Sequence, residues 1–340
     1  MGEGLEQLAA QAPGDSRRDS RRNRLFGDRS LQLYSRSEAR RRRRTHRHLK
    51  CRRHSGCVGG LAMPLLVTSA SDTNGNGFGA LLAFELDGRF RGTFIEDDRI
   101  TDPRGLAIDP KENLLFLNSG ADRVLAISSQ GHVVRDTGRI EGLNPGGGNL
   151  GPDGRYFVGL RSARTIIGLS ANLDTPPEHL LPPQVVPFPR GFAFGHDGRL
   201  FLASGIGPNG QGDNAILAFT LSTPLQPFRL VADPELSPLD LAVAPNGNIV
   251  VSSERPFGAV DAVTSVREYD TTDGHLVRVF SPNGKAEFRK PRGLRFTPNG
   301  LLYCVARDEV VAFDFASGEC LGAIARLRRL NGQALVFFPE

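Results

Sequence analysis

Five arginines stand at corresponding places along the chain and could bind an anion together. Three of them, Arg104, Arg190 and Arg292, lie in a repeated Pro-Arg-Gly motif, and two more, Arg161 and Arg307, end short apolar segments. A guanidinium group can form two parallel hydrogen bonds with a carboxylate or a phosphate. The set therefore predicts a small anionic ligand or a protein partner. A second interpretation stays open for the motif arginines, namely that each pairs with a nearby acid and stiffens its own loop.

Two carboxylates depart from the pattern around them and could support metal or acid–base chemistry. Asp240 stands where the Pro-Arg-Gly motif has glycine, and Glu254 ends an apolar segment. With the amides of Asn149 and Asn118 they could offer the oxygen ligands that Ca²⁺ or Mg²⁺ prefers. In that interpretation Asp240 and Glu254 are catalytic and the cation acts as a Lewis acid. The alternative for Asp240 is that it caps a neighbouring loop.

The elements that would position these residues form an internal repeat. Related segments begin at five prolines, spaced by 42, 44, 49 and 53 residues: Pro103, Pro145, Pro189, Pro238 and Pro291. Seven residues after each proline comes a turn, and four of the five turns carry Asp-Gly or Asn-Gly, the dipeptides that accept positive φ in tight hairpins. Apolar strands follow each turn. Four strands in a unit of about 45 residues are typical of a β-propeller blade.

The two ends of the repeat region predict how the ring closes. Residues 65–95 supply only three strands, whereas residues 330–337 repeat the pattern of an innermost strand. If this last strand completes the first blade, six blades result and two open strand edges disappear. We therefore expect an all-β, six-bladed propeller over residues 63–340, with closure by the C-terminal strand. In such a ring the innermost strands all begin at one face, the channel mouth, where the second strands end.

The pattern PRGLAID…LLFLNSGADRVLAISSQGHV resembles an NHL-type repeat. NHL-type repeats belong to a superfamily of six-bladed propellers that includes gluconolactonase-like and streptogramin-lyase-like enzymes. The resemblance covers residues 63–340 and implies the architecture more than an activity. Gluconolactonase-like propellers hold a divalent cation with Glu, Asn and Asp, which implies Ca or Mg for the set named above. Streptogramin-lyase-like propellers carry an acid where Glu254 stands, and a histidine where this chain has Arg or Leu.

The absence of a histidine at the expected channel mouth decides which functional hypothesis is favoured. All seven histidines lie in the first 60 residues or at positions expected on the opposite face or outer edge, so a histidine base or zinc at the mouth is disfavoured. The leading hypothesis is an NHL-type propeller that binds a small anionic ligand or protein partner at the channel mouth. The alternative is a metal-dependent hydrolase or lyase, lactonase-like or streptogramin-lyase-like, with a central divalent cation.

The charge is divided unevenly between the start of the chain and the repeats. Residues 1–60 carry 16 Lys and Arg against 6 Asp and Glu, and the remaining residues carry 26 against 31. We expect residues 1–62 to be a disordered Arg/Ser-rich leader. It could be a tail for nucleic acid or an acidic partner, an organellar targeting segment, or an over-extended start preceding Met63. Nucleic acid is a partner only in the first case. No apolar run is long enough for a membrane span or a secretory signal, which predicts a cytoplasmic protein.

Overall fold

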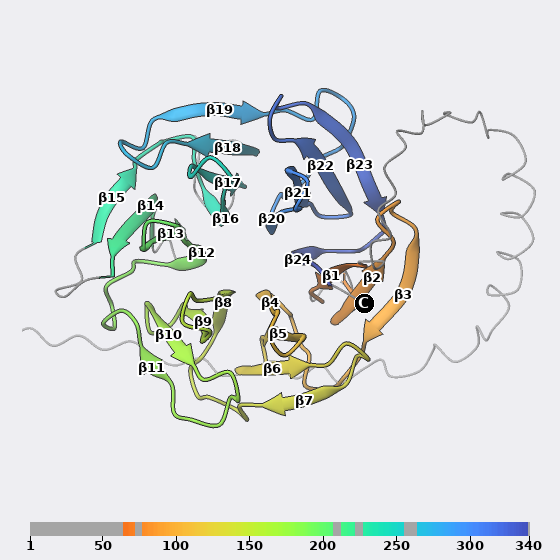
Figure 1. Ribbon diagram of the computed structural model, residues 1–340, viewed down its shortest axis with the longest axis vertical. Coiled ribbons are helices and arrows are strands. Elements are labelled where there is room, and N and C mark those ends of the chain that lie inside the picture. Colours follow the sequence, from red (N-terminus) through yellow and green to blue (C-terminus); the bar gives the residue numbers. More distant parts are fainter. Residues whose placement is uncertain (1–63, 72–76, 207–211, 222–226, 255–263, 339–340) are drawn as a thin grey trace, which may run out of the picture. The chain divides into compact units, whose positions relative to one another are not determined.

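Six four-stranded antiparallel sheets surround a central axis in the computed structural model (Figure 1). The structure describes residues 64–338 except for 72–76, 207–211, 222–226 and 255–263. Within these residues every regular element is a strand, and none is a helix long and apolar enough to cross a bilayer. The prediction of an all-β, six-bladed propeller is confirmed. The predicted leader lies outside the described residues, so its nature stays a prediction.

Each blade is one sheet, with its strands ordered from the axis outward. The strands of blades 1 to 3 are β24 (Gly332–Phe337), β1 (Leu65–Ser69), β2 (Ala80–Phe84), β3 (Phe90–Ile95); β4 (Leu106–Asp109), β5 (Leu114–Ser119), β6 (Arg123–Ile127), β7 (Val133–Asp136); and β8 (Pro145–Leu150), β9 (Tyr156–Leu160), β10 (Thr165–Leu169), β11 (Glu178–His179). Those of blades 4 to 6 are β12 (Pro189–Phe194), β13 (Arg199–Ile206), β14 (Gly212–Thr220), β15 (Pro227–Val231); β16 (Pro238–Val243), β17 (Ile249–Ser253), β18 (Ser265–Tyr269), β19 (Leu276–Phe280); and β20 (Leu294–Phe296), β21 (Leu301–Val305), β22 (Glu309–Asp314), β23 (Cys320–Arg326).

The ring is closed by the last strand, as the repeat predicts. Strand β24 pairs antiparallel with β1, with Leu65 opposite Phe337 and Val67 opposite Leu335. The innermost position of blade 1 is thus filled from the other end of the chain (Figure 1). This pairing satisfies the backbone groups of two strands that would otherwise present open edges.

Apolar side chains of neighbouring blades pack against one another between the sheets. The second and third strands are buried along most of their length, whereas outermost strands such as β19 are largely exposed. Phe116 of blade 2, for example, stacks on Tyr156 of blade 3 with 4.9 Å between ring centroids. A shared cluster of this kind lies at each of the six junctions between blades. Burial between sheets therefore fixes how the blades, and the inner strand ends, face the axis.

Glycine recurs at the start of the inner strands because the strands approach closely there. A Cβ on Gly147 would lie 2.8 Å from the Cα of Gly191, and one on Gly293 would lie 2.7 Å from the Cα of Ala334. Register shifts interrupt pairing at this position in β8, β12 and β16. No side chain fits between these backbones. The residue before each of these glycines therefore lies at the channel mouth.

Candidate functional site at the channel mouth

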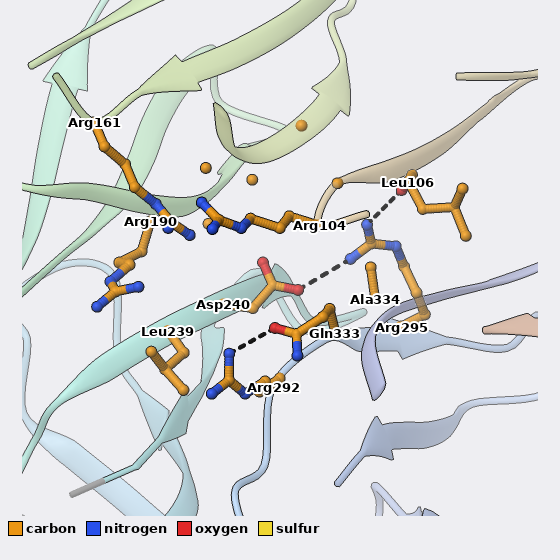
Figure 2. Close-up of a pocket in the computed structure, with 15 residues that line it drawn as sticks. Arg104, Leu106, Arg161, Arg190, Leu239, Asp240, Arg292, Arg295, Gln333 and Ala334 are labelled. Atoms are coloured by element: carbon orange, nitrogen blue, oxygen red, sulfur yellow. Dashed lines mark hydrogen bonds and ion pairs between the residues drawn. The ribbon is translucent and has the colours of Figure 1, made fainter. Parts of the chain in front are cut away.

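A small pocket lies at the axis, where all six blades contribute the first residues of their inner strands (Figure 2). Its space is about 50 Å³, enough for a few water molecules or a small ion. The lining residues are Arg104, Gly105, Leu106, Gly146, Gly147, Gly148, Arg161, Arg190, Gly191, Leu239, Asp240, Arg292, Arg295, Gln333 and Ala334. Four of the five arginines predicted from the sequence meet here. The pocket combines five arginines with a single carboxylate, so it is strongly cationic.

Two of the motif arginines have a carboxylate of their own. Arg104 pairs with Asp102 and also donates to the carbonyl oxygen of Pro145 at 3.1 Å. Arg292 lies 3.1 Å from Glu254 Oε2 and donates to Gln333 Oε1 at 2.6 Å. For these two residues the interpretation of local pairing describes the structure. Their charges are partly neutralised before any ligand arrives.

Arg161 differs because the structure provides it with no such partner. Its Nε–H is shielded from solvent and donates to no partner, and its guanidinium forms no ion pair within the described residues. The group points toward Arg104 and Arg190 (Figure 2) and lies 5.9 Å above the ring of Phe188. Burial, followed by the charges of Arg104 and Arg190, lowers the pKa of Arg161 well below its usual value. The protein therefore holds a cation in an environment that disfavours it.

Arg190 lies beside Arg161 (Figure 2) and is subject to similar electrostatic effects. Its guanidinium stacks on Phe188 at 4.6 Å from the ring centroid. Burial, followed by the charges of Arg292 and Arg104, lowers the pKa of Arg190 to about 10. Glu254 acts in the opposite direction but does not compensate for these effects. Burial is the main cause of the lowered pKa values of both residues, and the neighbouring arginines lower them further.

Asp240 and Arg295 form a bridge across the axis. Asp240 Oδ2 accepts hydrogen bonds from the backbone N–H of Leu294 at 3.1 Å and from Arg295 at 3.4 Å. The Arg295 guanidinium also donates to the carbonyl oxygen of Leu106, 2.9 Å away in blade 2 (Figure 2). Burial raises the pKa of Asp240, although the charge of Arg295 partly opposes that shift. Asp240 thus links blade 5 to blade 6, the capping role that the sequence left open for it.

The sequence did not select Arg295 or Gln333 as site residues. A signal for Arg295 exists, because it replaces the alanine found at Ala107, Ala193, Ala242 and Ala334 in sister strands. Arg295 also lines a second hollow of about 300 Å³ together with Ala107, Asn149 and Val336. Its side chain therefore separates that hollow from the mouth pocket. Gln333 carries no comparable signal.

The remaining predicted metal ligands are already engaged by the protein. The buried Asn118 accepts a hydrogen bond from the Tyr156 hydroxyl at 2.8 Å through Oδ1. Asn149 Oδ1 accepts from the backbone N–H of Leu150 at 2.9 Å. Glu254 is also held by Lys290 at 3.6 Å, in addition to Arg292. These contacts support the strands, and the proposed metal set stays a prediction.

Two other groups of charged residues lie away from the mouth pocket. Arg307 lines a separate hollow of about 250 Å³ together with Glu287, Arg289, Asp308, Glu309 and Arg326 to Arg328. In the turn between β18 and β19, Asp270, Asp273 and His275 place ligand atoms within 4.8 Å of one another, close enough to hold a metal ion. This turn lies at the end of blade 5 opposite the mouth, because antiparallel strands alternate in direction.

Comparisons with known proteins identify the architecture. No family model matches the chain, and no curated protein matches it in sequence. Among solved structures, a chain of a nidogen/laminin complex superimposes with a TM-score of 0.63 at 14% identity, over 81% of this chain and 98% of that one. A protein provisionally named a gluconolactonase gives a TM-score of 0.54 at 17% identity, over 68% and 80%. A streptogramin B lyase gives 0.48 at 14% identity, over 64% and 67%.

The nidogen/laminin chain and the provisionally named gluconolactonase show that this chain has the fold of a six-bladed propeller, with a neighbour of a kind that the sequence resembles. The expectation of such neighbours is confirmed at the level of fold. The same fold carries several functions, so a function must be argued from the site.

Proposed function

We propose that this propeller binds a small oxyanion, a carboxylate or a phosphate-like group, at its channel mouth. The observation that carries the proposal is Arg161, whose shielded Nε–H has no hydrogen-bond partner and which forms no ion pair among the described residues. Its side chain is aimed into a pocket that four further arginines line (Figure 2). A buried cation without a counterion costs several kcal/mol. An anion between Arg161 and Arg104 would supply the missing acceptor, and charge-assisted hydrogen bonds contribute about 1.5–3 kcal/mol each.

The size of the pocket limits what enters it. About 50 Å³ accommodates a small anion or the charged end of a larger molecule, but no bulky group. A small molecule is therefore favoured over a protein partner, although a neighbour of this fold is found in a complex with laminin. A protein side chain that ends in a carboxylate would have to insert fully into the mouth.

The electrostatics of the pocket disfavours the alternative, a lactonase-like or lyase-like enzyme with a cation at the centre. Five arginines against Asp240 would repel Ca²⁺ or Mg²⁺. Asp240 and Glu254 already pair with Arg295 and Arg292. Their proposed roles are accordingly to orient these arginines.

The test is isothermal titration of the full chain with acetate, phosphate and sulfate in a chloride buffer, comparing the wild type with Arg161→Met. We expect the wild type to bind at least one anion and the variant to bind it about tenfold or more weakly, because one charge-assisted interaction is lost. Arg155→Met is the matched control, since Arg155 also stacks on a phenylalanine, Phe157, but lies outside the mouth. It should bind as the wild type does.

Stability provides a second readout for the same variants. Arg161→Met removes a disfavoured buried charge, so the ligand-free variant should unfold at the same or a higher temperature than the wild type. Weaker binding then cannot be attributed to misfolding. Unchanged anion binding by Arg161→Met, or no binding of any anion by the wild type, would refute the proposal.

A further inference from the structure

The mouth pocket contains a hydrogen-bond acceptor as well as its arginines. The hydrogen bonds that Asp240 accepts from Leu294 and Arg295 both end on Oδ2. The other oxygen, Oδ1, points to the side of the pocket where Arg104, Arg161 and Arg190 lie (Figure 2). It also occupies the space that a side chain at Gly191 would fill. The backbone N–H of Leu241 also donates to the Asp240 carboxylate. A simple anion bound by the arginines would bring a second acceptor against Oδ1 and no further donor.

We propose that the ligand is a short 2-hydroxycarboxylate, with its carboxylate on the arginines and its hydroxyl donating to Asp240 Oδ1. This inference rests on the proposed function and specifies its ligand. A hydroxyl next to the carboxylate satisfies Oδ1 without adding negative charge beside Asp240. An unmatched acceptor in a closed site costs binding free energy, which is how such sites reject analogues that lack the donor.

The charge and the size of the pocket further restrict the class of ligand that it can bind. An ammonium group could also donate to Asp240, but it would add a positive charge among five arginines. The neutral hydroxyl avoids this repulsion, so 2-hydroxy acids are favoured over amino acids. The walls are tightly packed, because Gly147 lies against the backbone of Gly191, and Gly148 lies against the side chain of Tyr156. With about 50 Å³ available, we expect two- and three-carbon acids to fit.

The experiment compares matched acids by titration of the full chain. Glycolate should bind about tenfold or more tightly than acetate, and lactate than propionate, because each pair differs by the hydroxyl alone. Glycine and alanine should bind more weakly than glycolate and lactate. Equal affinity within each pair of acids would overturn this inference but leave the proposed oxyanion site intact. No binding of any carboxylate, phosphate or sulfate would refute both the inference and the proposed function.

Asp240→Asn sharpens the test by exchanging the acceptor for a donor. With its oxygen kept toward Leu294 and Arg295, the asparagine amide nitrogen would face the ligand. The variant should then favour pyruvate, whose 2-oxo group accepts, over lactate. An unchanged preference for lactate in a folded variant would contradict the assignment of Asp240. The wild-type comparison of matched acids remains decisive if the variant does not fold.

Discussion

At the scale of single residues, the arginines of the channel mouth differ in whether the protein itself supplies them with a partner. Arg104 and Arg292 each pair with a carboxylate nearby, and the bridge of Asp240 and Arg295 joins blades. Arg161, which follows the end of β9, lines the same pocket without such a partner among the described residues. The arginines that are paired with nearby carboxylates stabilise their loops. The positive charge of Arg161, which is not paired in this way, is the charge that an anionic ligand could bind.

The role of Asp240 can be tested by restoring the glycine of the sister motifs. The repeat alone suggests that Asp240→Gly is harmless, but the structure predicts a loss of about 1–3 kcal/mol in the free energy of unfolding. The substitution removes the acceptor of the Leu294 amide and leaves Arg295 without its carboxylate. Urea unfolding measures the effect. If the additional change Arg295→Met recovers part of the loss, the charge of Arg295 is its source. Stability equal to that of the wild type would argue against the bridge.

At the scale of elements, ion pairs in the connections hold neighbouring blades together at the mouth face. Asp97, between β3 and β4, accepts from Arg99 Nε at 2.8 Å and from the Arg99 backbone N–H at 2.9 Å. Arg99 also lies 3.4 Å from Asp136 at the end of β7. These contacts tie the connection from blade 1 to blade 2.

This connection should give a measurable pH dependence. Hydrogen bonds from Arg99 lower the pKa of Asp97 from 3.8 to about 2. The carboxylate therefore stabilises the fold above about pH 4, and that contribution is lost as the pH falls toward 2. Asp97→Asn should lower the free energy of unfolding at pH 7 by less than about 1 kcal/mol, because the pair is partly exposed. The difference between variant and wild type, measured by urea unfolding, should shrink between pH 4 and 2. A difference that grows over this range would contradict the assignment.

At the scale of the whole molecule, ring closure by β24 joins the two ends of the propeller into one sheet. Leu335 is fully buried opposite Val67, in the cluster that joins blades 6 and 1. In a closed ring each blade packs against two neighbours, so a defect at the closure weakens both adjoining junctions.

Leu335→Ala should therefore destabilise the protein by about 2–5 kcal/mol, as a cavity in a packed core does. Leu321→Ala is the matched control, because Leu321 also lies in a strand but is 45% exposed, and it should cost less than about 0.5 kcal/mol. Thermal or urea unfolding compares the two. Similar small effects for both variants would mean that the closing strand contributes little to the stability of the ring.

The sequence by itself determined the blades, their number and the closing strand. These follow from a repeat whose apolar strands and Asp-Gly or Asn-Gly turns need only local structure and burial on both faces. Gly154 and Gly247, for example, have the positive φ that the turn dipeptides predict. The repeat also predicted four of the arginines that line the mouth pocket, because equivalent positions in a ring share one face, but it missed Arg295 and Gln333.

Only the tertiary structure decided which of those residues have partners. Arg295 reaches Leu106, 189 residues away in sequence, and Asn118 binds Tyr156 of the next blade. Whether an arginine is neutralised, or an amide oxygen is available for a metal, depends on contacts between blades that no single repeat contains. The physical reason is that hydrogen bonds and ion pairs act over about 3 Å, whereas the spacing of a repeat specifies a position only to within a loop.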